Sequence, residues 1–325
     1  MKSKKLEEDK ILDSILRPKK WQDFVGQEKI KYSLQIMIEA AKKKSKTCDH
    51  ILFYGPSGVG KTTLAHLVAK QLSGKITVSS GPAIKKVGDL AAILTNLENG
   101  EIFFIDEIHR LNKQIEEVLY PAMESGQLHL VIGKGVSARS LELNLPRFTL
   151  IAATTRPSLI SSPLRNRFGS ISHLDFYQGP EMEQIVKRSA KILEVKISPE
   201  AIRMLAQASR ATPRIANRVL KRTWDLAVVK NKQIIDKTLV EQSLKILDID
   251  NFGLESMDRK LIELIIKKHR GGPVGIQTLA AALNEEKDTI ENVYEPYLLR
   301  LGLIERTARG RIATKLAYEY SKKQF

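Results

Sequence analysis

Residues 55–63 of this 325-residue chain read GPSGVGKTT. The spacing matches G-x-x-x-x-G-K-[ST], the phosphate-binding loop that follows a strand and opens a helix. The apolar run 51–54 predicts that strand, and residues 61–72 have the apolar spacing of a helix. The glycines of such a loop let backbone N–H groups surround phosphates, and the helix N-terminus adds positive potential. We therefore predict a nucleotide-binding domain here rather than a chance glycine-rich turn.

A second phosphate-related signal lies downstream, where the apolar run 102–105 is followed by Asp106 and Glu107. Ligands of open α/β sheets bind at the carboxyl ends of the strands, so both acids should face the phosphates. We expect Lys61 to bind the β- and γ-phosphates of ATP, and Thr62 and Asp106 to ligate Mg²⁺. Glu107 would orient and activate the attacking water. A helix N-cap pair is the structural alternative for the two acids.

Polar residues also follow the apolar run 148–153. Thr154 and Thr155 end this run, where a hydroxyl would reach the γ-phosphate. Arg165 and Arg167 come next, with no acidic residue nearby in sequence. Such an arginine is a candidate finger that reaches the ATP of a neighbouring subunit. An ordinary surface arginine is the alternative.

The order of apolar patterns predicts the architecture of the first part of the chain. Short β-branched or apolar runs occur at 51–54, 76–78, 102–105 and 148–153. Helical patterns, such as 61–72 and 113–123, separate them. Alternation of strand and helix indicates an α/β domain with a mostly parallel sheet, strands buried on both faces, and helices on both sides.

The later segments have a different character. Residues 181–250 have helical spacing, broken at the prolines 199 and 213, which predicts a small all-helical domain. After a linker at 251–253, helical patterns are followed by two short runs around Gly310, which is the order of a winged helix. The helices are expected at 258–269, 278–283 and 289–301, and the strands at 303–306 and 311–314. The expected domains are an α/β core at 1–179, a helical lid at 180–252 and a winged helix at 253–325.

Composition limits the function classes. The formal net charge of +16 favours a polyanionic partner, with a lysine-rich solubilising surface as the alternative. The one cysteine, Cys48, excludes an internal disulfide and is expected in the core. No apolar stretch is long enough to span a membrane, and the charged N-terminus lacks the apolar segment of a signal peptide. We expect a cytoplasmic protein.

The combined motifs resemble the AAA+ ATPases, and more narrowly the RuvB family of bacterial Holliday-junction branch-migration motors. The narrower resemblance rests on LRP at 16–18, FVGQ at 24–27, FIDEIHRL at 104–111 and RTARGR at 306–311. It extends from about residue 14 to 320 and includes the domain order. It implies ATP and Mg²⁺ as ligands and a homohexameric ring on duplex DNA or a Holliday junction. It also implies RuvA and RuvC as partners.

The resemblance also implies roles for individual residues. Leu16 and Arg17 would line the adenine pocket, Arg167 would be the finger, and Arg214 would be a second sensor on the lid. Tyr177 would contact the nucleotide. The phosphates would be held by Gly58, Val59, Gly60, Lys61, Thr62 and Thr63. Thr155 is the sensor candidate at the end of its strand, with Thr154 as the alternative.

The expected α/β core also contains a candidate hairpin and two departures from the family pattern. Residues 128–145 predict a hairpin of alternating apolar residues, which in the family docks on RuvA; core strands are the alternative. Ser57 stands where the family usually has proline, and the loop keeps its glycines. Residues 124–126 read ESG in place of an acidic-acidic-aromatic run, which weakens nucleotide contacts inferred for that stretch.

The winged helix predicts how DNA is held. Its second helical element is acidic, with Glu285, Glu286, Asp288, Glu291 and Glu295, and is poorly suited to a phosphate-lined groove. The wing carries Arg306, Arg309 and Arg311, which predicts backbone contacts without base recognition. A clamp-loader subunit would not need this arginine-rich wing. A DNA-binding regulator would need a basic recognition helix, and a protein unfoldase would lack DNA-stimulated turnover.

Overall fold

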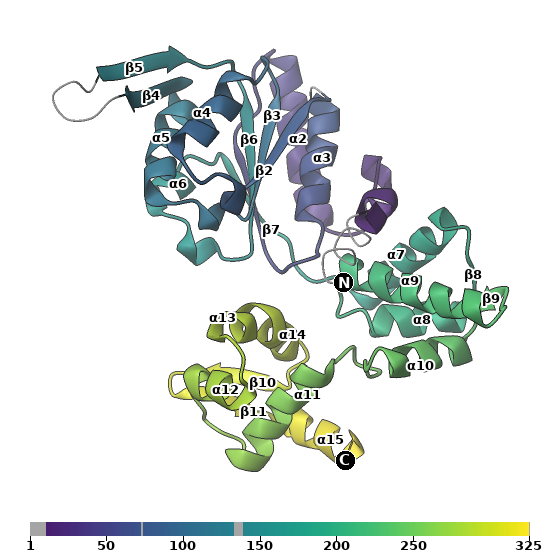
Figure 1. Ribbon diagram of the computed structural model, residues 1–325. Coiled ribbons are helices and arrows are strands. Elements are labelled where there is room, and N and C mark those ends of the chain that lie inside the picture. Colours follow the sequence, from purple (N-terminus) through teal and green to yellow (C-terminus); the bar gives the residue numbers. More distant parts are fainter. Residues whose placement is uncertain (1–10, 73, 133–138, 325) are drawn as a thin grey trace. The chain divides into compact units, whose positions relative to one another are not determined.

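The computed structural model describes residues 11–72, 74–132 and 139–324 (Figure 1). The chain forms two compact units. We call residues 17–55 and 59–175 the sheet unit, and residues 11–16, 56–58 and 176–324 the helical unit. The predicted core domain begins at residue 1, so its first ten residues lie outside the described part of the chain.

Five parallel strands form the sheet, in the order β2-β3-β6-β1-β7. Their parallel direction agrees with the prediction from the strand–helix alternation. They are β1 (Ile51–Tyr54), β2 (Ile76–Ser80), β3 (Ile102–Asp106), β6 (Thr149–Thr154) and β7 (Ser170–His173). The central strands β1, β3 and β6 are almost wholly buried. The prediction that β2 is buried on both faces is wrong, because β2 is an edge strand and Val78 is half exposed. The other edge strand, β7, alternates in burial and was not expected from the sequence.

Helices cover both faces of this sheet, with α2 and α3 on one side and α4 and α5 on the other (Figure 1). Their apolar faces pack on the strands; Leu94 and Leu119, for example, join Phe103 and Leu150 in one fully buried core. Phe103 and Leu150 are paired neighbours on β3 and β6. The helices are α2 (Glu28–Lys43), α3 (Lys61–Leu72), α4 (Val87–Thr95), α5 (Lys113–Glu124) and the short α6 (Ser162–Arg165).

The predicted hairpin is present as the antiparallel strands β4 (Gln127–Ile132) and β5 (Arg139–Asn144). Leu128 is fully buried, and three more leucines at the base pack against the sheet core: Leu130, Leu143 and Leu145. Leu141 is exposed. The base of the hairpin therefore follows the core-strand alternative, while residues 133–138 lie outside the described part of the chain.

The lid in the helical unit consists of α7 (Gly179–Ile192), α8 (Pro199–Gln207), α9 (Pro213–Val229) and α10 (Lys237–Ile246). Proline occupies a first-turn position in α7, α8 and α9, where its missing N–H costs no hydrogen bond. The Ser198 hydroxyl caps α8 by accepting from the Ala201 N–H. The lid also contains a two-residue parallel ladder, β8 (Lys196–Ile197) with β9 (Ile234–Ile235), which is too short to leave a period-two pattern. Along the described residues, we find no helix with the length and apolarity to cross a bilayer.

The C-terminal segment has the predicted helix order followed by a wing. Two of its helices contain a π-helical turn, at Leu264–Lys268 after α11 and at Ile290–Tyr294 before α14. The wing pairs β10 with β11, and Val274 adds a bridge to Arg311. The elements are α11 (Ser256–Glu263), α12 (Ile276–Leu283), α13 (Lys287–Thr289), α14 (Glu295–Arg300), β10 (Ile304–Thr307), β11 (Gly310–Ala313) and α15 (Lys315–Gln324). The closing helix α15 was not expected from the sequence.

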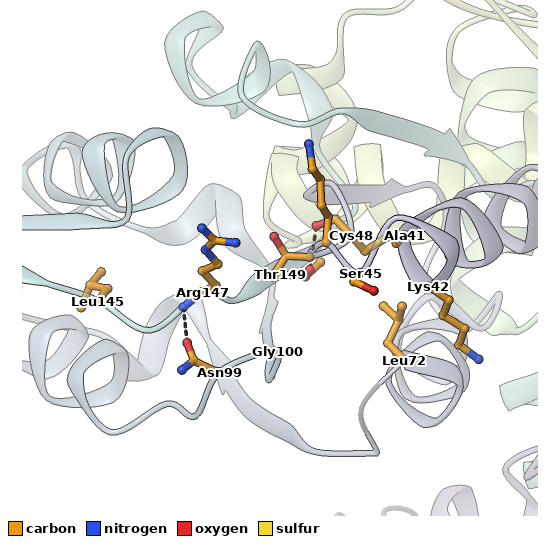
Figure 2. Close-up of a pocket in the computed structure, with 12 residues that line it drawn as sticks. Ala41, Lys42, Ser45, Cys48, Leu72, Asn99, Gly100, Leu145, Arg147 and Thr149 are labelled. Carbon is orange, nitrogen blue, oxygen red and sulfur yellow. Dashed lines mark hydrogen bonds between the residues drawn. The ribbon is translucent and has the colours of Figure 1, made fainter.

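A cavity of about 680 Å³ opens where the strands begin, beside Cys48, Gly100 and Thr149 (Figure 2). Thr149 Oγ1 donates to the Cys48 carbonyl at 2.7 Å, and Asn99 Oδ1 accepts from the Arg147 backbone N–H at 3.0 Å. Parallel strands put their beginnings and their ends at opposite edges of a sheet. The cavity is therefore remote from the strand ends at which Asp106 and the phosphate loop emerge.

Substitution of Gly55 tests the close approach of β1 to β7. Gly55 has φ +140°, and a Cβ there would lie 2.0 Å from the Leu174 carbonyl oxygen. Gly55→Ala should lower the free energy of unfolding by about 1–3 kcal/mol from the backbone alone, because both the conformation and the contact exclude a side chain. Gly88→Ala is the control, since a Cβ at Gly88 has nothing within 4 Å. Urea unfolding curves of equal midpoint for the two variants would contradict this account.

Alkylation of Cys48 tests its burial. Burial, followed by the negative charge of Asp49, raises the pKa of the Cys48 thiol to about 11, so the thiol is protonated at neutral pH. Because the thiolate is the nucleophile, the folded protein should react slowly at pH 7, with a rate rising about tenfold per pH unit toward pH 11. The urea-unfolded chain should level off near its ordinary pKa of about 8.5. Identical pH profiles for the folded and unfolded chains would refute the prediction.

Candidate functional site

The phosphate loop has the backbone that the sequence predicts. Gly55, Gly58 and Gly60 have φ values of +140°, +81° and +103°, which favour glycine. Lys61 begins α3 and is 7% exposed, and its ammonium donates to the Gly55 carbonyl at 2.8 Å. The loop therefore holds a buried cation over the N-terminus of a helix, which suits an anion. Val59 is buried, and Thr62 and Thr63 follow in the first turn of α3.

Loop residues 56–58 group with the helical unit, where they meet Arg214 of α9. Arg214 Nη1 lies 3.4 Å from Ser57 Oγ, and its Nε donates to Asp13 Oδ2 at 3.1 Å. A Cβ at Gly58 would lie 3.0 Å from the Arg214 Cβ, so this position requires a small residue. The sequence-predicted sensor arginine is thus beside the phosphate loop. Asp13, its partner, was missed because no motif contains it.

The end of β3 brings the predicted acids and threonines together. Glu107, with φ +51°, directs its carboxylate toward Thr155, whose hydroxyl donates to Glu107 Oε2 at 3.3 Å. Thr154 is fully buried, and its hydroxyl contacts His109 Nδ1 at 2.9 Å and accepts from the Arg156 N–H. Thr155 is therefore the threonine whose hydroxyl reaches the acid of the site.

His109 is a site residue that sequence reasoning missed. Its Nδ1 lies 3.3 Å from Glu107 Oε2 as well as beside Thr154. Burial lowers the pKa of His109, opposed by the charge of Glu107, so the neutral ring is favoured. Its position three residues after Asp106, between Ile108 and Arg110, gave no sign of this contact. A neutral imidazole can donate one hydrogen bond and so help to orient the Glu107 carboxylate.

Leu16 and Arg17, predicted to line the adenine pocket, and Tyr177, predicted to contact the nucleotide, are divided between the two units. Leu16 is buried, and its carbonyl accepts from Arg188 Nη1 at 3.0 Å. Tyr177 is 2% exposed, and its backbone N–H donates to the Ala211 carbonyl at 3.0 Å. Arg17 belongs to the sheet unit, where its charge adds to burial in lowering the pKa of His66.

Arg167, the predicted finger, has partners that its local sequence does not reveal. Its Nη2 lies 3.0 Å from Glu124 Oε1, its Nη1 donates to the Pro163 carbonyl, and its guanidinium carbon lies 4.5 Å from the Tyr120 ring centre. Tyr120 is in turn held by Ser161 Oγ, 3.0 Å from its hydroxyl. The Arg167 Nε is buried without a hydrogen-bond partner. Glu124 therefore acts within the chain as the acidic partner of Arg167.

The wing arginines differ in their contacts. Arg311 is 14% exposed, with Nε 2.5 Å from Glu295 Oε1 and Nη2 3.3 Å from Glu291 Oε1. Arg306 Nη2 also contacts Glu295, at 2.5 Å, although half of its side chain is exposed. The hydrogen bond to Glu295 raises the pKa of Arg311. Across the described residues, Arg309 has no carboxylate at ion-pair distance, and it is exposed. Arg309 is the wing cation most available to a phosphate.

Comparison with known proteins gives the family. Residues 16–174 match the Holliday junction DNA helicase RuvB P-loop domain, residues 177–250 the RuvB AAA lid domain, and residues 251–322 the RuvB C-terminal winged helix domain. The RuvB Holliday junction branch migration motor of Thermotoga maritima is 48% identical, with a TM-score of 0.87, and covers 95% of this chain and 98% of its own. A point variant of that protein gives a TM-score of 0.86 at 48% identity, over 94% of this chain and 98% of its own. The chain belongs to the RuvB family, P-loop ATPases that act as Holliday-junction branch-migration motors.

Proposed function

We propose that this chain is an ATP-driven DNA translocase that moves the branch point of Holliday junctions during recombination and repair. One observation carries the proposal. A single compact unit holds both Arg214, beside Ser57 of the phosphate loop, and a wing whose exposed Arg309 has no carboxylate at ion-pair distance among the described residues. A nucleotide-dependent movement of that unit would therefore act on bound DNA. We also propose a cytoplasmic location, where a bacterial chromosome lies.

The nucleotide is proposed to bind along the phosphate loop. Lys61 and the N-terminal N–H groups of α3 would hold the phosphates, and Arg214 would approach them from the lid. Leu16 and Arg17 would contact the adenine, and Tyr177 would contribute to the same pocket. Gly58, Val59, Gly60 and Thr63 would line the phosphates.

Mg²⁺ is proposed to bind through the Thr62 hydroxyl and the Asp106 carboxylate. Both supply oxygen, the donor that Mg²⁺ prefers. Asp106 is the last residue of β3, and Thr62 lies in the first turn of α3. When bound there, the ion would offset negative charge on the β- and γ-phosphate oxygens. Asp106 Oδ1 accepts the Glu107 backbone N–H at 3.0 Å, which fixes the orientation of its carboxylate.

Glu107 is proposed to act on the attacking water. The carboxylate would accept a proton as the water oxygen bonds to the γ-phosphorus, while the bond from that phosphorus to the β–γ bridging oxygen breaks and ADP leaves. The Thr155 hydroxyl would help to orient the carboxylate and the water. Thr155 and His109 contact the same oxygen, Glu107 Oε2, at 3.3 Å each. This leaves the second oxygen, Oε1, to bind the water.

We propose a hexameric ring in which Arg167 completes the ATP site of the next subunit. Its contacts with Glu124 and the Pro163 carbonyl lie at a partly exposed position, so a γ-phosphate could replace the carboxylate as partner. Arg167 would then replace its charge-assisted pair with Glu124 by a charge-assisted pair with the phosphate. RuvA would dock on the hairpin 128–145 through its outer part, where Leu141 is exposed, and RuvC would join the same complex.

Arg167→Ala should abolish turnover and spare ATP binding. The finger stabilises charge only in the transition state, so we expect ATPase activity to fall by about 10³-fold or more. Fluorescent ATP-analogue titrations should give nearly unchanged affinity. Arg165→Ala is the control, because Arg165 is exposed at the end of α6, two residues before Arg167. Strong ATPase activity in Arg167→Ala would exclude the finger role.

Mixed rings test whether the finger acts on a neighbour. Arg167→Ala subunits keep an intact Lys61 pocket, and Lys61→Ala subunits keep an intact Arg167. If the finger acts between subunits, mixing the two inactive proteins creates complete sites, and ATPase activity should reappear. A finger acting within its own subunit predicts no recovery at any mixing ratio.

Arg309→Ala should weaken DNA binding to the same extent on unrelated sequences. Loss of one phosphate contact should reduce the slope of log affinity against log salt by about 0.9. Arg311→Ala is the contrast, because it removes a partner from the buried Glu295 and should lower the melting temperature first. Unchanged affinity and salt slope in Arg309→Ala would show that this arginine does not contact DNA.

A further inference from the structure

The winged helix is joined to the lid by one buried arginine. Arg210 lies in the loop between α8 and α9, is 7% exposed, and forms an ion pair with the fully buried Asp258 of α11. Its Nη2 also donates to the Val293 carbonyl at 3.1 Å, and its guanidinium lies 4.8 Å from the Tyr297 ring centre. A lid arginine thus contacts three separate positions of the winged helix.

A second set of contacts surrounds the first. Arg300 of α14 donates to the Tyr177 carbonyl at 2.6 Å and lies 5.1 Å from the Phe176 ring centre. Phe176 in turn packs against Tyr297, with ring centres 6.2 Å apart. Arg210 therefore extends from the lid to the winged helix, and Arg300 extends from the winged helix to residues 176 and 177. Together they fix both sides of the junction.

The linker between the two domains is also held. A Cβ at Gly253 would lie 3.0 Å from the Ala208 carbonyl oxygen, so the linker backbone packs directly on the lid. The Tyr297 hydroxyl donates to the Phe252 carbonyl at 2.7 Å, and the Tyr320 hydroxyl donates to Asp250 Oδ2 at 2.5 Å. A segment held on both sides cannot serve as a free tether.

The junction reaches the loop that carries the nucleotide-sensing arginine. Arg210 and Ala211 both have positive φ, +51° and +52°, which is uncommon for non-glycine residues. Such conformations persist where surrounding contacts enforce them. The Ala211 carbonyl accepts from Tyr177, and Arg214 lies three residues beyond Ala211. A displacement of Arg214 would therefore also displace Arg210, because only a short, constrained stretch of backbone separates them.

We propose that Arg210 is a positioning residue that clamps the winged helix to the Arg214 loop, so that nucleotide-driven movement of this loop carries the DNA-binding wing with it. The inference rests on the proposed function, in which Arg214 senses the nucleotide and the wing holds DNA. Arg210 itself contacts neither ligand. Its loss should uncouple ATP hydrolysis from DNA movement without preventing either binding step.

The test uses the full-length variant Arg210→Met with Asp258→Asn. Removing both charges together avoids an unpaired buried ion, and the Asn side chain keeps an acceptor for the Glu255 N–H that Asp258 now binds at 2.9 Å. ATPase activity without DNA and the affinity for duplex DNA should stay close to wild type. Junctions migrated per ATP hydrolysed, measured on a synthetic four-way junction with RuvA, should fall by at least about tenfold, within the usual range of coupling between sites.

Arg218→Met is the matched control. Arg218 also joins the lid to the winged helix, through Glu255 at 2.8 Å, but both side chains are more than 40% exposed. An exposed pair of this kind contributes little, so the migration yield per ATP should be unchanged. An equal loss in Arg218→Met would show that any contact at the junction matters, and would overturn the specific role of Arg210.

A labelling experiment measures the clamp in the folded wild-type background. Cys48 is buried, so exposed cysteines at Lys232→Cys in the lid and Lys287→Cys in the winged helix can carry a dye pair. The dye distance should be the same with ADP and with a non-hydrolysable ATP analogue. A distance that changes with the nucleotide would overturn the clamp, even if the double variant failed to fold.

The outcomes separate this inference from the proposed function. If the wild-type protein hydrolyses ATP but never moves a junction, the proposed function fails. If the wild-type protein migrates junctions and the folded double variant does so at the same ATP cost, the function stands and the clamp is wrong.

Discussion

The parallel direction of the five strands is the constraint on which the nucleotide site depends. Because β6 lies between β3 and β1, the carboxyl ends of these three strands are adjacent. The phosphate loop after β1, Asp106 at the end of β3 and Thr155 after β6 therefore emerge side by side. The register pairs Ile51 with Ile151 and Ile102 with Thr149. A slip by one residue would turn buried side chains to the opposite face and separate the groups of the site.

The helical unit depends instead on buried charges that are fully paired. Burial raises the pKa of the Asp258 carboxyl, and the nearby Arg210 opposes this shift. Glu295 is likewise buried and takes two arginines from the wing. Loss of one partner from such a pair costs about 3–5 kcal/mol, whereas the intact pair adds little net stability. These pairs therefore fix the geometry of lid, helix and wing more than they stabilise the fold.

Local pattern predicted the parts of the structure that depend on short stretches of sequence. The phosphate loop, the acids after β3, the central strands and the order of the winged helix were all predictable, because glycine spacing and apolar periodicity are local properties. The edge strand β7 was not, since its alternating burial leaves few apolar residues in a row. The partners of Arg167 and Arg210 were not predictable either. Glu124 and Asp258 lie more than forty residues away in sequence, and only the tertiary fold brings them together.

Arg210 and Arg167 differ in whether the carboxylate that each now contacts would be buried or solvated without its arginine. This difference decides which arginine can change partner. If Arg210 left Asp258, a buried carboxylate would remain with its Oδ1 already lacking a hydrogen bond, so this arginine is held in place. If Arg167 left Glu124, the carboxylate would be solvated, because 59% of that side chain is exposed. The buried, unpaired Nε of Arg167 also gains from a partner that offers several oxygens, as a phosphate does. Arg210 is therefore suited to the proposed clamp and Arg167 to the proposed finger, because the partner carboxylate is buried in the first case and exposed in the second.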